Sequence, residues 1–248
     1  MQTGSGNHEM ALKAGILRRL RNVVAGRDLF QRVQVNCPTR SLGSDYGGWS
    51  VATTGLGRAS VVYSFGVGED ISFDTALIEA FGMPVHAFDP TPRSAVWLES
   101  QSLPAEFLFH PYGLADHDGT MTFYEPKNRH HVSHSTLSHG EVDESRAHQW
   151  QVRRLDSIMK ELGHQTIDVL KIDIEGGEYA VIDDLCRSLI RPTQILVEFH
   201  HHFPGITRRQ SLTAIRSLED IGYRIFTISA TAVEYGFLLP GGRQILYT

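Results

Sequence analysis

The segment from Val61 to Pro92 constrains the fold of this chain more than any other. It begins with an apolar run at 61–65, which has the length and β-branched content of a buried strand. A glycine turn at 66–68 follows, then a helical apolar pattern, then a second apolar run at 85–88 that ends in an aspartate. This order of strand, turn, helix, strand and acid predicts the first half of a nucleotide-binding α/β unit.

Strands and helices are expected to alternate through the rest of the chain. The alternation predicts an α/β fold with a mostly parallel sheet and helices on both faces. A polar, histidine-rich loop is expected at 125–144, and a closing hairpin is expected across the turn at 240–242. The strands are predicted at 107–109, 121–124, 167–174, 195–199, 223–229, 236–239 and 244–247, and the helices at 155–162, 178–189 and 209–221.

The predicted organisation has three parts: a disordered tail at 1–10, an N-terminal helix and lid-like segment at 11–60, and the main domain at 61–248. The basic amphipathic helix at 11–30 is expected to pack over the core, although a membrane-surface or partner helix is an alternative. The irregular stretch that follows holds Tyr46-Gly47-Gly48-Trp49, an aromatic pair that suggests a lid over a ligand.

Composition agrees with an ordinary globular enzyme, because 41% hydrophobic and 21% charged residues lie close to the averages for such proteins. A net charge of −5 provides no electrostatic footprint for nucleic acid. Cys37 and Cys186 have neither metal nor redox spacing. No membrane span or signal peptide is recognisable, so a cytoplasmic location is expected. The oligomeric state cannot be read from the sequence.

The glycine turn narrows the choice of nucleotide. Ile71 stands where a dinucleotide fingerprint has its third glycine, and the chain contains no phosphate-binding P-loop motif. Asp89 follows Gly68 by 21 residues, near the spacing of an acid that binds ribose hydroxyls. A dinucleotide remains possible, but the missing glycine favours a ligand without phosphates, such as S-adenosylmethionine.

The segment 168–178, DVLKIDIEGGE, resembles the signature of the FkbM-type S-adenosylmethionine-dependent methyltransferases. Five further pieces match that family in the same order, and the motifs YSFGVGED and YGGW resemble a methyltransferase-like branch also found in animals. The five pieces are the strand and turn at 61–70, HAFDPTP at 86–92, GLAD at 113–116, RLD at 154–156 and LVEFH at 196–200.

The resemblance implies a Rossmann-like class I methyltransferase fold, with a mostly parallel seven-stranded sheet whose last strand is antiparallel. It also implies S-adenosyl-L-methionine as cofactor. One position departs from the family pattern: Ser64 stands where the family has an acid that helps to hold the methionine part of the cofactor. Glu69 or Asp70 is a possible substitute.

The residues expected to bind the cofactor lie in the matching pieces. Each has a structural alternative: a tight turn for the glycines, a helix N-cap for Asp89, and a plain loop for the segment after residue 112. The set is Phe65, Gly66, Val67, Gly68, Glu69, Asp89, Pro90, Gly113, Leu114 and Asp173. The residues expected to contact the acceptor are Tyr46, Trp49, His134 and Glu175.

Asp173, Glu198 and His200 end two expected strands, and open α/β sheets bind ligands beyond the carboxyl ends of their strands. We therefore expect these three to be catalytic, with His200 as general base and a carboxylate orienting it. Glu178 is expected to be structural, because an acid in the first turn of a helix is stabilised by the macrodipole. A divalent metal on the same three residues is a rival arrangement that is not favoured.

The expected reaction is methylation of a hydroxyl group on a small metabolite or sugar. Two other classes remain open. An NAD(P)-dependent oxidoreductase would use the same turn and Asp89, and a non-catalytic cofactor-binding protein would explain Ser64. Neither nucleic acid nor a membrane is an expected partner.

Overall fold

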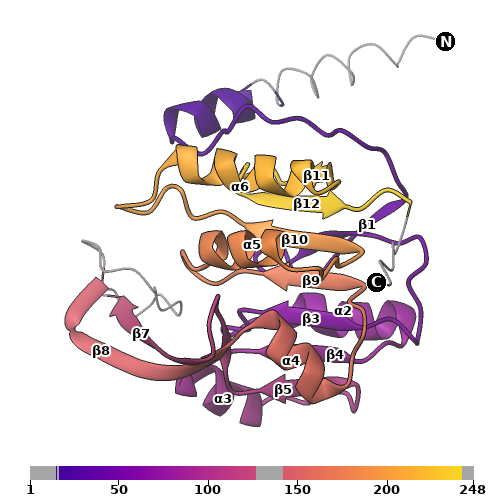
Figure 1. Cartoon of the computed structure of the whole chain (residues 1–248), viewed down its shortest axis with the longest axis vertical. Coiled ribbons are helices and arrows are strands. Elements are labelled where there is room, and N and C mark those ends of the chain that lie inside the picture. The colour runs from indigo at the N-terminus through magenta and orange to yellow at the C-terminus, as the bar shows by residue number, and fades with distance from the viewer. Residues whose placement is uncertain (1–14, 16, 127–141, 242–248) are drawn as a thin grey trace.

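The computed structural model describes residues 15, 17–126 and 142–241. Its central element is a seven-stranded sheet in the order β11-β12-β10-β9-β3-β4-β5 (Figure 1). The five strands from β10 to β5 in this order run parallel to one another, and β12 is antiparallel to both of its neighbours. The sheet consists of β3 (Val62–Phe65), β4 (Val85–Phe88), β5 (Phe107–His110), β9 (Val169–Ile172), β10 (Gln194–Glu198), β11 (Arg224–Ile228) and β12 (Glu234–Leu238).

Helices cover both faces of this sheet, as the alternation predicts. Side chains that alternate along each strand divide the core in two, so that Tyr63 and Phe65 face one layer while Val62 faces the other. The layer on Tyr63 contains α4 (Leu155–Leu162), α5 (Glu178–Arg187) and α6 (Arg208–Asp220). The layer on Val62 contains α2 (Ser72–Phe81) and α3 (Pro92–Glu99). The predicted mixed α/β sheet is confirmed.

The predicted terminal hairpin is wrong. Strand β12 already pairs with β10 on one edge and with β11 on the other, so neither edge is free for residues 244–247. Those residues lie outside the described part of the chain. The antiparallel strand therefore sits inside the sheet, and its hairpin partner is the strand before it.

The N-terminal region contains regular structure that was not expected. β1 (Thr39–Leu42) and β2 (Trp49–Ala52) form an antiparallel hairpin, and its turn carries the glycines of the aromatic motif. Each strand has only four residues, too few for a clear alternating pattern. Before this hairpin, residues 17–24 are helical. Leu17 is 67% exposed and Val24 89% exposed, so the apolar face of this helix does not pack on the core as predicted.

A second sheet extends to one side of the large one (Figure 1). It has the order β6-β8-β7 and is built from β6 (Gly113–Leu114), β7 (Gly119–Pro126) and β8 (Val142–Arg153). Strand β8 was not predicted: its first residues fall in the expected loop at 125–144, and no strand was expected in the rest of it. Its sequence, VDESRAHQWQVR, has no apolar run, and pairing with β7 stabilises it instead.

Four aromatic side chains pack together beside β4 and β5. His86 Nδ1 lies 3.0 Å from His110 Nε2, and His164 Nδ1 lies 2.7 Å from the Tyr63 hydroxyl. Burial, together with the neighbouring histidines, lowers the pKa of His86 to about 4. These rings are therefore neutral packing elements at neutral pH.

We expect this cluster to make the fold acid-sensitive. The unfolded chain binds a proton at His86 near pH 6.5 and the folded chain only near pH 4, so stability is lost as the pH falls between these values. Between pH 7 and pH 5, denaturant unfolding should show a loss of about 2 kcal/mol from His86 alone. His86→Phe should remove this part. His117→Gln is the control, because Asp116 raises the pKa of that half-exposed ring. An undiminished loss in His86→Phe would contradict the assignment.

Candidate active site

A cavity of about 780 Å³ opens at the carboxyl ends of β3, β4, β9 and β10. Its floor is the glycine turn, one wall comes from β6 and β7, and the β1–β2 hairpin forms part of its rim. The described residues of the predicted site that line it are Tyr46, Trp49, Phe65, Gly66, Val67, Gly68, Glu69, Asp89, Pro90, Gly113, Leu114, Asp173, Glu175 and Glu198. His134 lies outside the described residues.

Gly66 has a structural reason to be glycine. Its φ is +88°, a backbone region that side chains rarely adopt, and a Cβ there would overlap the carbonyl oxygen of Asp173. The Gly66 amide donates to Phe88 O at 3.0 Å, and the Asp173 amide donates to Phe65 O at 3.2 Å. The turn is therefore fastened to the ends of both neighbouring strands.

Asp89 holds the same turn from the side of β4. Its Oδ2 accepts from the amides of Val67 at 3.1 Å and Gly68 at 2.9 Å. Its Oδ1 accepts from the amide of Thr91 at 2.8 Å and from the Thr91 hydroxyl at 2.6 Å. These four donors match the four acceptor sites of a carboxylate. Asp89 thus orders the turn, in addition to any ligand contact.

The wall beyond β4 is apolar. Gly113 and Leu114 form β6, and a Cβ on Gly113 would lie 3.3 Å from the ring of Pro90, so the two segments are closely packed. Glu69, at the other side of the turn, pairs with Arg93, whose Nε is 2.7 Å from the carboxylate. Glu69 is therefore paired with α3 at the edge of the cavity, and its substitution for the acid that is absent at position 64 stays a prediction.

The region around Ser64 contains a different set of charges. Ser64 is fully buried in β3 and is paired in register with Lys171 of β9. The Lys171 ammonium donates to Gly66 O at 2.8 Å and lies 3.6 Å from Asp173. From α2, the buried carboxyl of Asp74 faces this region, and burial raises its pKa. A buried lysine under the glycine turn was not expected from the sequence.

Asp173, Glu175, Glu198 and His200 converge at the floor of the cavity. His200 Nε2 lies 3.8 Å from Asp173, 3.6 Å from Glu175 and 3.9 Å from Glu198. The structure therefore brings together the three residues predicted to be catalytic and adds Glu175 to them. His200 itself is only 2% exposed and lies behind the three carboxylates, which line the cavity.

Glu178 is the site residue that sequence reasoning missed. It is fully buried, and its Oε1 lies 3.3 Å from His200 Nδ1 and accepts from the His200 amide at 2.9 Å. Its Oε2 accepts from the Gly176 amide at 2.9 Å. The carboxylate that orients the imidazole is thus Glu178, and not Asp173 or Glu198 as predicted. An acid in the first turn of a helix is already explained by the helix macrodipole. For this reason the sequence did not indicate its contact with His200, just beyond the end of β10.

The electrostatics of this cluster are strongly coupled. Although burial opposes it, the negative charges of Glu178 and Glu175 hold the pKa of His200 well above its ordinary value. Burial opposes ionisation of Glu178 as well, yet His200 and the hydrogen bonds keep the pKa of Glu178 low. Burial and the nearby Asp173 raise the pKa of Glu198 to about 8. The site therefore favours a positive charge at its centre.

The β1–β2 turn is anchored above this cluster. The Ser44 hydroxyl donates to Asp70 Oδ2 at 2.7 Å, and the Ser72 amide donates to Asp70 Oδ1 at 2.7 Å. Partial burial of the hydroxyl and, to a smaller extent, the negative charges of Asp173 and the other carboxylates raise the pKa of Tyr46. This mostly exposed side chain therefore lies close enough to the cluster to interact with its charges. The structure thus puts the aromatic motif at the rim of the cavity, as the lid hypothesis requires.

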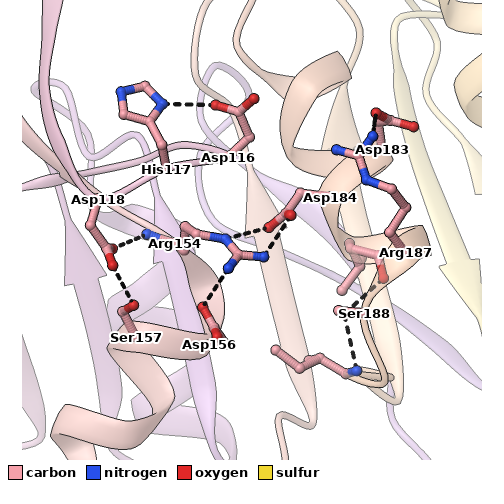
Figure 2. Close-up of polar contacts among 12 residues, drawn as sticks. Asp116, His117, Asp118, Arg154, Asp156, Ser157, Asp183, Asp184, Arg187 and Ser188 are labelled. Carbon is pink, nitrogen blue, oxygen red and sulfur yellow. Dashed lines mark hydrogen bonds and ion pairs between the residues drawn. The ribbon is translucent and has the colours of Figure 1, made fainter.

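A polar network braces the wall from outside (Figure 2). Arg154 Nη2 and Nε bind the carboxylate of Asp184 at 2.7 and 3.2 Å, which joins the start of α4 to α5. Asp118 accepts from the Arg154 amide and from the Ser157 hydroxyl, and so ties the turn before β7 to the first turn of α4. Asp116 bonds to His117 at 2.9 Å. The matching GLAD and RLD pieces therefore meet in space.

The parallel sheet with an inner antiparallel strand, and a cavity at its carboxyl edge over a glycine turn and a terminal acid, define a Rossmann-like fold of the class I methyltransferase type. The sequence profile described as the Methyltransferase FkbM domain matches residues 61–225. The chain belongs to the FkbM methyltransferase family.

Individual relatives agree with this assignment. The chain is 30% identical over 175 residues to human probable methyltransferase-like protein 24, covering 66% of this chain and 41% of the relative. The rat protein of the same name is 30% identical over 176 residues, covering 66% and 42%. A segment of 64 residues is 41% identical to the AMB antimetabolite synthetase AmbE of Pseudomonas aeruginosa, which is 25% of this chain and 3% of that protein. The chain spans about two fifths of the length of the methyltransferase-like relatives.

Among the described residues, none of the helices has the length and apolar character that crossing a membrane requires. Both cysteines are free, in agreement with their spacing in the sequence.

Proposed function

We propose that this chain transfers a methyl group from S-adenosylmethionine to a hydroxyl group of a small metabolite or sugar. One observation carries the proposal: the cavity joins the glycine turn and Asp89 of a cofactor site to the carboxylates of Asp173, Glu175 and Glu198. Donor and acceptor groups can therefore occupy one continuous cavity. Alignment of the two is the main catalytic requirement, because the sulfonium already activates the methyl group.

The cofactor's parts have matching surfaces along the cavity. The adenine fits the apolar wall of Leu114 and Pro90, and the methionine portion fits above the glycine turn. The ribose hydroxyls would bind Asp89, whose acceptor sites are engaged by the protein itself. One site becomes free when the Thr91 hydroxyl turns toward Ser94 Oγ, which lies 2.8 Å away.

Methyl transfer forms the bond from the acceptor oxygen to carbon, breaks the bond from that carbon to sulfur, and releases the hydroxyl proton. The carboxylates of Asp173 and Glu175 line the cavity and can accept this proton. The assignment of His200 as general base stays a prediction. Because the ring is almost fully buried behind these carboxylates, an acceptor would meet them first.

Removing the Asp89 carboxylate should weaken cofactor binding. We expect Asp89→Ala to raise the Kd for S-adenosylmethionine at least tenfold, a loss of about 1.4 kcal/mol, because the turn loses two acceptors and the ribose loses its partner. Isothermal titration of the full chain measures the change. Asp116→Ala is the matched control, since that aspartate bonds to His117 outside the cavity and should leave the Kd unchanged within twofold. Equal Kd values for wild type and Asp89→Ala would contradict this cofactor site.

A further inference from the structure

Four ligand-type atoms from two segments of the chain converge at the cavity floor. Asp173 and Glu175 follow β9, Glu198 ends β10, and His200 lies two residues further on. One donor atom each from Asp173, Glu175 and His200 lies within 4.8 Å of the other two. The Glu198 carboxylate is 3.9 Å from the same imidazole nitrogen. These separations suit atoms that share one central ion, rather than atoms bonded to one another.

The imidazole is aimed at this centre without a hydrogen bond there. Its Nε2 is 3.6 to 3.9 Å from the three carboxylates, beyond hydrogen-bond distance, although the residue is 98% buried. An ion bound between Nε2 and the carboxylates would give this nitrogen a ligand bond.

Glu178 completes the arrangement from behind. With its Oε1 at 3.3 Å from His200 Nδ1, it accepts the proton of that nitrogen. In the neutral ring, which is the form that binds a metal, the lone pair therefore lies on Nε2 and is directed at the carboxylates. Metal-binding histidines characteristically give their second nitrogen to a carboxylate in this way. Glu178 also accepts from the amides of His200 and Gly176, so its position is fixed.

The backbone bends to bring Glu175 into the cluster. Its φ is +51°, which is uncommon for a residue other than glycine, and the following Gly176 has φ +102°. The carboxylate of Glu175 consequently reaches His200, although Asp173 already lies on the same side. The result is an excess of negative charge around a single imidazole.

We propose that Asp173, Glu175, Glu198 and His200 bind a divalent cation of the oxygen-preferring class, Mg²⁺ or Mn²⁺. Three carboxylates with one imidazole form the donor set, and such a predominance of oxygen favours these ions over zinc or copper. The three carboxylates also line the cavity, so the remaining coordination positions face the space assigned to the acceptor. The structure thus adds Glu175 and Glu178 to the metal arrangement that the sequence left as an unfavoured rival.

The cation's part in catalysis rests on the proposed function. As a Lewis acid it would bind the acceptor hydroxyl and make its proton easier to remove, while the methyl group moves from sulfur to that oxygen. Cation binding itself does not depend on the cofactor and can be measured alone.

The test is titration of Mn²⁺ into the EDTA-treated, dialysed full chain without cofactor, with free Mn²⁺ followed by electron paramagnetic resonance. Wild type should bind one Mn²⁺ per chain, and excess Mg²⁺ should displace it. Glu175→Gln and Asp173→Asn should each weaken binding at least tenfold. Circular dichroism checks that each variant is folded, and the second variant provides the answer if the first is not.

Asp45→Asn is the matched control, because Asp45 lines the same cavity but is not one of the four residues proposed to bind the cation. This variant should bind Mn²⁺ as wild type does. No binding to wild type, or equal weakening by Asp45→Asn, would overturn the proposal. Titration of S-adenosylmethionine in EDTA separates the two proposals: cofactor binding without Mn²⁺ binding removes only the metal site, and the reverse removes only the proposed function.

Discussion

Gly66→Ala should destabilise the protein by about 3 kcal/mol and abolish binding of S-adenosylmethionine. A Cβ at residue 66 would overlap the carbonyl oxygen of Asp173, and the φ of +88° adds backbone strain for any other residue. Overpacking and a strained φ each cost about 1–3 kcal/mol. The turn can relieve the overlap only by moving away from β9, which displaces the surface on which the methionine portion would lie.

Gly68→Ala is the control for this change. Its φ is +55°, but a Cβ there meets nothing within 4 Å, so only the strain of about 1 kcal/mol remains. Urea unfolding of both variants measures the difference. Equal destabilisation of the two would show that the contact between the turn and Asp173 is not important for stability.

Glu178→Gln should cost about 3 kcal/mol, although the side chain is nearly isosteric. Glu178 is fully buried and His200 is 2% exposed, and removing one member of a buried charge pair leaves the other uncompensated. Gln has one acceptor oxygen where Glu178 uses two, so the measured loss combines the missing charge with one missing acceptor, for Gly176 or for His200. Chemical denaturation at neutral pH gives the free energy of unfolding.

Asp183→Asn provides the comparison, because that acid pairs with Arg187 on the exposed side of the same helix. It should change stability by less than about 0.5 kcal/mol. If both variants lose equally little, His200 does not depend on Glu178 and the orientation argued for the imidazole fails.

Local patterns in the sequence were sufficient to predict most of the sheet. Apolar runs in the sequence predict β3, β4, β9 and β10, and helical periodicity predicts the helices between them. The bounds predicted for α4 are those observed. The missed elements are those stabilised by partners distant in sequence. Strand β8 is polar and forms against β7, and the hairpin at the N-terminus packs on the sheet through short strands.

The residues of the site likewise fall into those that local sequence predicts and those that depend on contacts distant in sequence. Asp89 and the glycine turn follow from spacing within one α/β unit. The role of Glu178 instead depends on His200, which is 22 residues away and follows the end of β10. Similarly, the sequence pattern places Lys171 within strand β9 and indicates nothing more. In the structure its ammonium lies under the glycine turn that follows β3. Such contacts arise from the order of strands in the sheet, which a local pattern does not contain.

The most direct test of the central claim is calorimetric titration of the full chain with S-adenosylmethionine and, separately, with NAD. The predicted result is saturable binding of S-adenosylmethionine to one site per chain, weakened by Asp89→Ala, and no binding of NAD. Binding of NAD alone, or of neither ligand by the folded protein, would contradict the account.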